Sequence, residues 1–125
     1  MSKDLETLTA ALLQAATRAG ADAADAMALD GTALGIDTRG GRLEQAERAE
    51  GLEFGLRVLI GQRSAVVSGS DARPEVLAAM AERAVAMARE APEDPYIGLA
   101  DPALLARDVD AAALELFDPA AEPSP

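Results

Sequence analysis

The sequence predicts an α+β fold: a helix, an antiparallel meander of four or five strands, a second helix packed on one sheet face and an extended C-terminal tail. Two stretches with helical periodicity flank a region in which apolar and polar residues alternate. Each helix has a single apolar stripe, so we expect both to cover the same face of the sheet. We place the α+β domain at residues 1–91, with helices at 3–19 and 74–91 and strands within 24–70, then a tail packing on the domain or a neighbour at 92–119 and a linker at 120–125.

The first helix is predicted from apolar residues that recur at steps of three and four. Ser2 is a candidate N-cap, and Gly20 follows the last turn, where glycine commonly ends a helix. The second helix begins at Pro74, whose missing N–H is not needed at the first helical position, and stops before Pro92. The apolar stripes are Leu5, Leu8, Leu12, Ala15, Ala16 and Ala19 in the first helix, and Leu77, Met80, Ala81, Ala84, Val85, Met87, Ala88 and Ala91 in the second.

Three pairs of turn residues divide the strand region. Asp30-Gly31 and Gly40-Gly41 are read as two-residue turns, so that Met27 faces Leu34 and Thr38 faces Leu43.

The clearest strand, 52–60, leads into Gly61-Gln62, where glycine in first position suits a type II′ turn. That turn pairs Val58 with Ala65 and Leu56 with Val67, which brings apolar side chains to one face. Leu59 points to the other face.

Composition excludes several classes of function. With 22 acidic and 11 basic residues, the net charge of −11 disfavours binding to a nucleic-acid backbone or to an anionic membrane. The 125 residues contain no histidine and no cysteine, so a zinc site and a thiolate nucleophile are not expected in this chain. Residues 1–20 do not resemble a signal peptide, and no apolar run reaches the length of a membrane span, so we expect a cytoplasmic protein.

The remaining candidate groups favour structure over chemistry. Asp22, Asp25 and Asp30 are read as a solvated turn region because they lack the spacing of a calcium loop. Ser64, Ser68 and Ser70 have no histidine to act as a base, and the glycines form no phosphate-binding motif. We predict no catalytic, cofactor-binding or metal-binding residues in this chain.

Several segments are similar to one protein family. Residues 51–71 (GLEFGLRVLIGQRSAVVSGSD), 74–77 (PEVL) and 93–101 (EDPYIGLAD) resemble the first domain of the TldD/PmbA metallopeptidases, and residues 40–44 (GGRLE) lie where such proteins have a strand after a glycine turn. The string at 114–119 (LELFDP) is more similar to the PmbA (TldE) branch.

This resemblance implies a role in a larger assembly. Family members pair a TldD-like subunit, which carries a zinc motif H-E-x-x-x-H in a later domain, with a PmbA-like subunit that lacks it. Together they degrade peptides and unfolded segments in the bacterial cytosol. No part of this chain matches the zinc motif, so the resemblance implies zinc in a partner subunit or a further domain and no catalytic residue here. The family usually has serine where this chain has Arg73, which cannot cap a helix N-terminus.

Three functions are therefore compared. The first is a non-catalytic N-terminal domain of a PmbA/TldE-like subunit that shapes the assembly and its substrate chamber. The second is a stand-alone adaptor module, and the third is an unrelated small enzyme that uses carboxylates. For the first, we assign Leu59, Tyr96, Leu116 and Phe117 as candidate interface residues.

Overall fold

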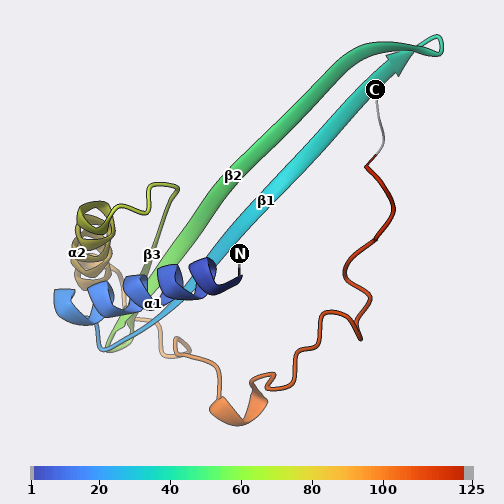
Figure 1. The fold of residues 1–125 in the computed structure, drawn as a ribbon. Coiled ribbons are helices and arrows are strands. Elements are labelled where there is room, and N and C mark those ends of the chain that lie inside the picture. The colour runs from blue at the N-terminus through green and yellow to red at the C-terminus, as the bar shows by residue number, and fades with distance from the viewer. Residues whose placement is uncertain (1, 123–125) are drawn as a thin grey trace. The chain divides into compact units, whose positions relative to one another are not determined.

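The computed structural model describes residues 2–122, with side chains from Asp4 onward. Its elements are α1 (Ser2–Ala19), β1 (Ala23–Arg39), β2 (Arg42–Ile60), β3 (Arg63–Gly69), α2 (Pro74–Glu90) and a short 3₁₀ helix, η1 (Pro102–Leu104) (Figure 1). The strands form one antiparallel sheet in the order β1-β2-β3. The predicted α+β class is confirmed, but the sheet has three strands and not four or five. The candidate N-cap side chain of Ser2 and residues 123–125 of the predicted linker lie outside the described residues.

The chain separates into two compact units, which are described separately. The first contains residues up to 33 together with 49–99, and therefore both helices and the three-stranded part of the sheet. The second contains residues 34–48 and those from 100 onward. The predicted boundaries at 91 and 119 stay predictions.

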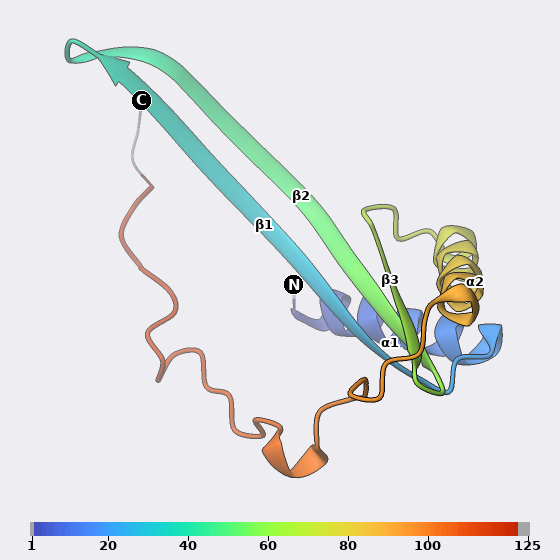
Figure 2. The same ribbon diagram turned by 180° about the vertical axis from the view of Figure 1, so that it is seen from behind.

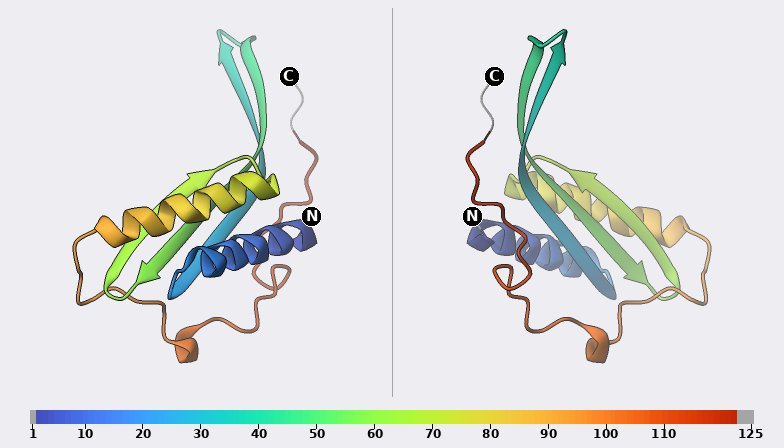
Figure 3. Two further views of the ribbon diagram at one scale, coloured as in Figure 1. Left: turned by 90° about the vertical axis from the view of Figure 1, so that its left-hand side faces the viewer. Right: turned by 90° about the vertical axis from the view of Figure 1, so that its right-hand side faces the viewer.

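Both helices of the first unit lie on the same face of the sheet, as predicted (Figure 3). Leu12 of α1 and Leu56 and Val58 of β2 are completely buried. The rest of the core is contributed mainly by α2, where small residues dominate. Its buried residues are Leu77, Met80, Ala81, Ala84, Val85 and Ala88.

The β2–β3 hairpin confirms the predicted register. Val58 pairs with Ala65 and Leu56 with Val67. Gly61 has φ of +56°, as the first position of the predicted type II′ turn requires. Figure 2 shows β2 between β1 and β3 in the region next to the helices.

The predicted turn at Asp30-Gly31 is wrong, because β1 continues without interruption from Ala23 to Arg39. The predicted pairing of Met27 with Leu34 is therefore also wrong, since both residues belong to one strand. The core side of β1 is formed by Ala24, Ala26 and Ala28, which pack against the core cluster, whereas Met27 is 65% exposed.

The two ends of α2 differ in how side chains outside the helix contact them. Arg73 is the N-cap residue and makes no capping hydrogen bond, as its chemistry predicts. Its guanidinium instead donates to Asp71, and Asp71 also accepts the backbone N–H of Arg73 at 3.1 Å. At the other end, Nη1 of Arg63 donates to the carbonyl oxygens of Arg89 and Ala91. The helix ends at Glu90, one residue before the predicted end.

The second unit contains the tip of the β1–β2 ribbon and the tail. Gly40 and Gly41 both have positive φ (+58° and +75°), which indicates a type I′ turn and agrees with the predicted two-residue loop. Nη1 of Arg48 donates a hydrogen bond to Oε2 of Glu122 at 3.2 Å. In the tail, Asp110 accepts the N–H of Ala112 and closes a small turn.

Candidate functional site

The acidic residues near the start of β1 serve two different structural purposes. Asp22 accepts the N–H of Gly61 at 2.8 Å, and its own N–H donates to the carbonyl of Leu59 at 2.9 Å, so the α1–β1 connection is fastened to the β2–β3 turn. Asp25 accepts two hydrogen bonds from Arg57, from Nε at 2.8 Å and Nη2 at 2.6 Å. This bidentate bond raises the pKa of the Arg57 guanidinium, against the smaller opposing effect of burial. Asp30 is exposed on β1 and not in a turn.

Within residues 2–122, no group of three or more potential ligand side chains is placed to hold a metal ion. None of the described helices is long and apolar enough to cross a membrane. Two serines considered for catalysis, Ser64 and Ser68, lie on β3 opposite Leu59 and Gly55.

The four candidate interface residues differ in exposure. Tyr96 is 95% exposed in the first unit, whereas Leu116 and Phe117 are 72% and 82% exposed in the second. Leu59 is only 4% exposed, so the expectation that it offers an open contact is not met within this chain. No local sequence pattern indicates this burial. Long-range bonds, from Asp22 to Leu59 and from the Asp94 N–H to the Gln62 carbonyl at 2.8 Å, bring two other segments to this end of the hairpin.

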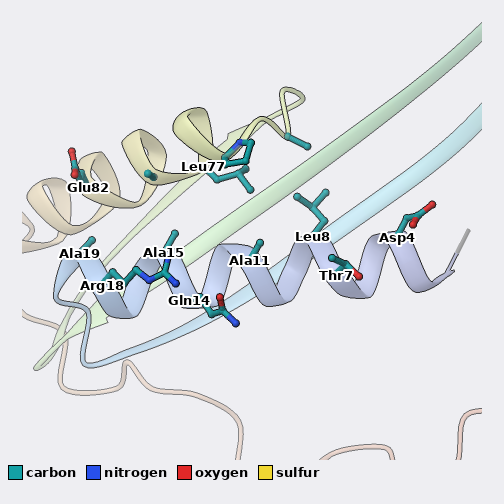
Figure 4. A pocket seen from close by; sticks show the side chains of 13 residues that line it. Asp4, Thr7, Leu8, Ala11, Gln14, Ala15, Arg18, Ala19, Leu77 and Glu82 are labelled. Carbon is teal, nitrogen blue, oxygen red and sulfur yellow. The ribbon is translucent and has the colours of Figure 1, made fainter.

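A groove with a volume of about 520 Å³ runs between α1 and α2 (Figure 4). Leu8, Ala11, Ala15 and Ala19 lie along the side of α1 that faces α2, and Leu77 contributes from α2. The groove is apolar along its length, with charged residues at its margins. The marginal charged residues are Asp4, Arg18 and Glu82. We call this the interhelix groove.

The opposite face of the sheet carries a second feature that the sequence did not reveal. Met27 and Leu29 of β1 and Val66 of β3 are 65%, 57% and 60% exposed on this face. They border shallow hollows, two of which meet at Gly55 of β2. We call this surface the open-face groove. The residues that line it include Asp25, Met27, Leu29, Gly31, Gly51, Glu53, Gly55, Arg57, Val66, Ser68 and Ser70.

The sequence was compared with models of known protein families. The family model described as PmbA/TldA metallopeptidase domain 1 matches residues 24–88. These residues include all three strands and most of α2, so the match covers the part of the chain that forms the sheet and one of its two covering helices.

Individual proteins are similar over a longer part of the chain. Metalloprotease PmbA from Escherichia coli O157:H7 is 33% identical over 99 residues, which are 79% of this chain and 22% of that protein. Solved structures also share the fold, and two of them are described. One is a candidate modulator of DNA gyrase from Bacteroides thetaiotaomicron (TM-score 0.75, 17% identity, 91% of this chain and 27% of that chain). The other is TldE from Thermococcus kodakarensis (TM-score 0.69, 14% identity, 82% and 23%). This chain thus spans about a quarter of the length of these proteins.

Proposed function

Because this chain belongs to the PmbA/TldD metallopeptidase family, as domain 1 of a family protein, we propose that it shapes the assembly and substrate chamber of a zinc metalloprotease whose metal centre lies on other residues. The observation that carries the proposal is the family match over residues 24–88 in a chain with no histidine or cysteine. A hydrolytic zinc ion is almost always held by at least one of these residue types. Its ligands therefore have to come from a TldD-like subunit or from further domains.

We assign the chain to the PmbA (TldE)-like branch, in the cytoplasm, with a TldD-like subunit as partner and peptides or unfolded segments as substrates. The tail string at 114–119 and the 33% identity to a protein named Metalloprotease PmbA support this branch. The exposed apolar side chains of Tyr96, Leu116 and Phe117 are our candidates for contact with the rest of the assembly. Buried aromatic side chains often dominate the energy of protein interfaces.

The proposal is tested by co-expression with a TldD-like subunit from the same genome. We expect the two chains to elute together in size exclusion, with about one zinc ion per TldD-like chain, and to hydrolyse an unfolded polypeptide such as reduced casein. A Leu116→Ser/Phe117→Ser double variant should lose co-elution. Leu104→Ser, which changes an equally exposed leucine of the same tail, should keep it.

Two results would count against the proposal. If the chain alone hydrolyses casein after exhaustive chelation, the chemistry resides in its own carboxylates and the third function is correct. If it never associates with the TldD-like subunit and its native form has the mass of 125 residues, the adaptor function replaces it.

A further inference from the structure

The open-face groove follows an alternation of glycine and larger residues along β2. On this face β2 presents Arg57, Gly55, Glu53 and Gly51 in succession, since alternate residues of a strand point to the same side. One hollow, of about 430 Å³, lies over Gly55, and another, of about 410 Å³, lies over Gly51 with Gly31 of β1. Each is wide enough for an aliphatic side chain.

The packing of this chain does not explain these glycines. A Cβ atom at Gly55 would be 3.8 Å from its nearest neighbour, the carbonyl oxygen of Val67, which is ordinary van der Waals contact. At Gly51 and Gly31 it would meet nothing within 4 Å. None of the three has the positive φ that favours glycine. Glycine inside a strand weakens it, and often marks a place where another backbone approaches closely.

The charge of the groove is negative. Arg57 is neutralised by its bidentate bond to Asp25, whereas Glu53 adds a further carboxylate to the lining of both hollows. A second copy of this chain, which also carries a net charge of −11, would be repelled. A ligand whose charge complements this negative groove would therefore carry lysine or arginine.

The spacing of the hollows selects an extended occupant. Gly55 and Gly51 are four residues apart on one strand, which corresponds to about 13 Å. Side chains i and i+4 of an extended segment have the same separation, whereas in a helix they are only about 6 Å apart. With i and i+4 in the two hollows, residue i+2 lies beside Glu53.

We propose that the open-face groove binds an extended polypeptide segment with aliphatic side chains at positions i and i+4 and a lysine or arginine at i+2. The inference rests on the proposed function, in which this domain meets unfolded segments before they are hydrolysed. The exposed side chains of Met27, Leu29 and Val66 supply the apolar walls, and the carboxylate of Glu53 pairs with the basic residue of the segment.

The test measures fluorescence anisotropy of labelled peptides added to the 125-residue protein. The first peptide is Thr-Leu-Thr-Lys-Thr-Leu-Thr, the second has Glu in place of Lys, and the third has Ala in place of both Leu. We expect the first to bind about fivefold more tightly than the second, with a difference that shrinks in high salt. The affinity of the first peptide should exceed that of the third by at least about tenfold.

Two variants address the groove itself. Gly55→Val fills one hollow and should weaken the first peptide about tenfold, and valine suits a strand, so the fold should persist. Glu53→Lys changes an exposed residue and should make the second peptide the better ligand. Ala78→Val, which narrows the interhelix groove, is the matched control and should bind like the parent.

The proposal is overturned if all three peptides bind equally, or if both groove variants are folded and bind like the parent. Amide shifts in NMR spectra that cluster along α1 and α2 would also contradict it. Self-association of the parent in sedimentation, abolished by Gly55→Val, would identify a second copy as the occupant instead. If peptide binding fails while the TldD-like subunit still co-elutes, only this inference is lost.

Discussion

Replacing Arg63 by alanine should remove the main side-chain anchor at the C-terminal end of α2. Nη1 donates to the carbonyls of Arg89 and Ala91, and the guanidinium also lies 3.8 Å from Glu93. A hydrogen bond to a charged group contributes about 1.5–3 kcal/mol, and a cation at a helix C-terminus about 0.3–1 kcal/mol. The contact with Arg89 is long, at 3.3 Å, and the side chain is 37% exposed, so a value near the lower end applies. We expect a loss of about 2 kcal/mol.

The measurement is urea unfolding followed by circular dichroism at 222 nm. For a small protein a loss of this size lowers the midpoint by roughly 1 M, with an unchanged slope. Arg63→Lys should fall between the parent and Arg63→Ala, because an ammonium keeps the charge but loses the planar fork. Arg83→Ala removes an exposed arginine from the same helix and is the control. If Arg63→Ala unfolds at the same urea concentration as Arg83→Ala, the helix end is not held in this way.

Three further perturbations follow from other parts of the first unit. The hydrogen bond from Arg73 lowers the pKa of the Asp71 carboxyl in the folded protein. The ionised carboxylate therefore stabilises the fold at pH values above its ordinary pKa, and this contribution is lost as the pH falls through the lowered folded-state pKa. In an NMR titration of Arg73→Ser, the pKa of Asp71 should return towards its ordinary value. If the new serine caps α2, Arg73→Ser should also raise the melting temperature, and an unchanged or lower value would show that the cap does not form. Gly20→Ala places a side chain at φ of +102° and should destabilise by about 1 kcal/mol in urea unfolding, whereas no change would show that the turn relaxes. Ala26→Leu should lower the free energy of unfolding by about 1–3 kcal/mol, because it overpacks the core side of β1. Met27→Ala changes an exposed residue and should alter the free energy of unfolding by less than about 0.5 kcal/mol. A larger loss for Met27→Ala than for Ala26→Leu would show that Met27, and not Ala26, faces the core.

The β2–β3 hairpin could be predicted from sequence because local signals agree there. Apolar residues alternate over 52–60, and Gly61 marks the turn, so register and buried face follow together. The helices were predictable for the same reason, since a stripe repeating at three and four residues has only one side to bury. Leu59 shows the limit. Its burial accompanies hydrogen bonds between segments distant in sequence, which no local pattern contains.

The exposed face of β1 could not be predicted, because it depends on a register that the turn alone does not set. A two-residue turn at Gly40-Gly41 pairs each even-numbered residue of β1 with an odd-numbered residue of β2, such as Thr38 with Leu43, and each odd-numbered residue of β1 with an even-numbered one. Continued to the base of the ribbon, this register would place Met27 and Leu29 on the core side with Phe54. The structure instead places even-numbered residues of both strands on the core side: the alanines of β1 at 24, 26 and 28 with Phe54, Leu56 and Val58.

A one-residue offset, as a β-bulge provides, therefore has to lie between the turn and the base of the ribbon. Hydrophobicity ranks methionine and leucine above alanine, so the pattern alone selects the wrong face. The alanines of β1 pack against the core cluster, and the same register leaves Met27 and Leu29 exposed on the other side. The unrecognised open-face groove thus has its origin in this offset, whereas the wrong turn at Asp30-Gly31 came from reading a glycine inside a strand as the position of a turn.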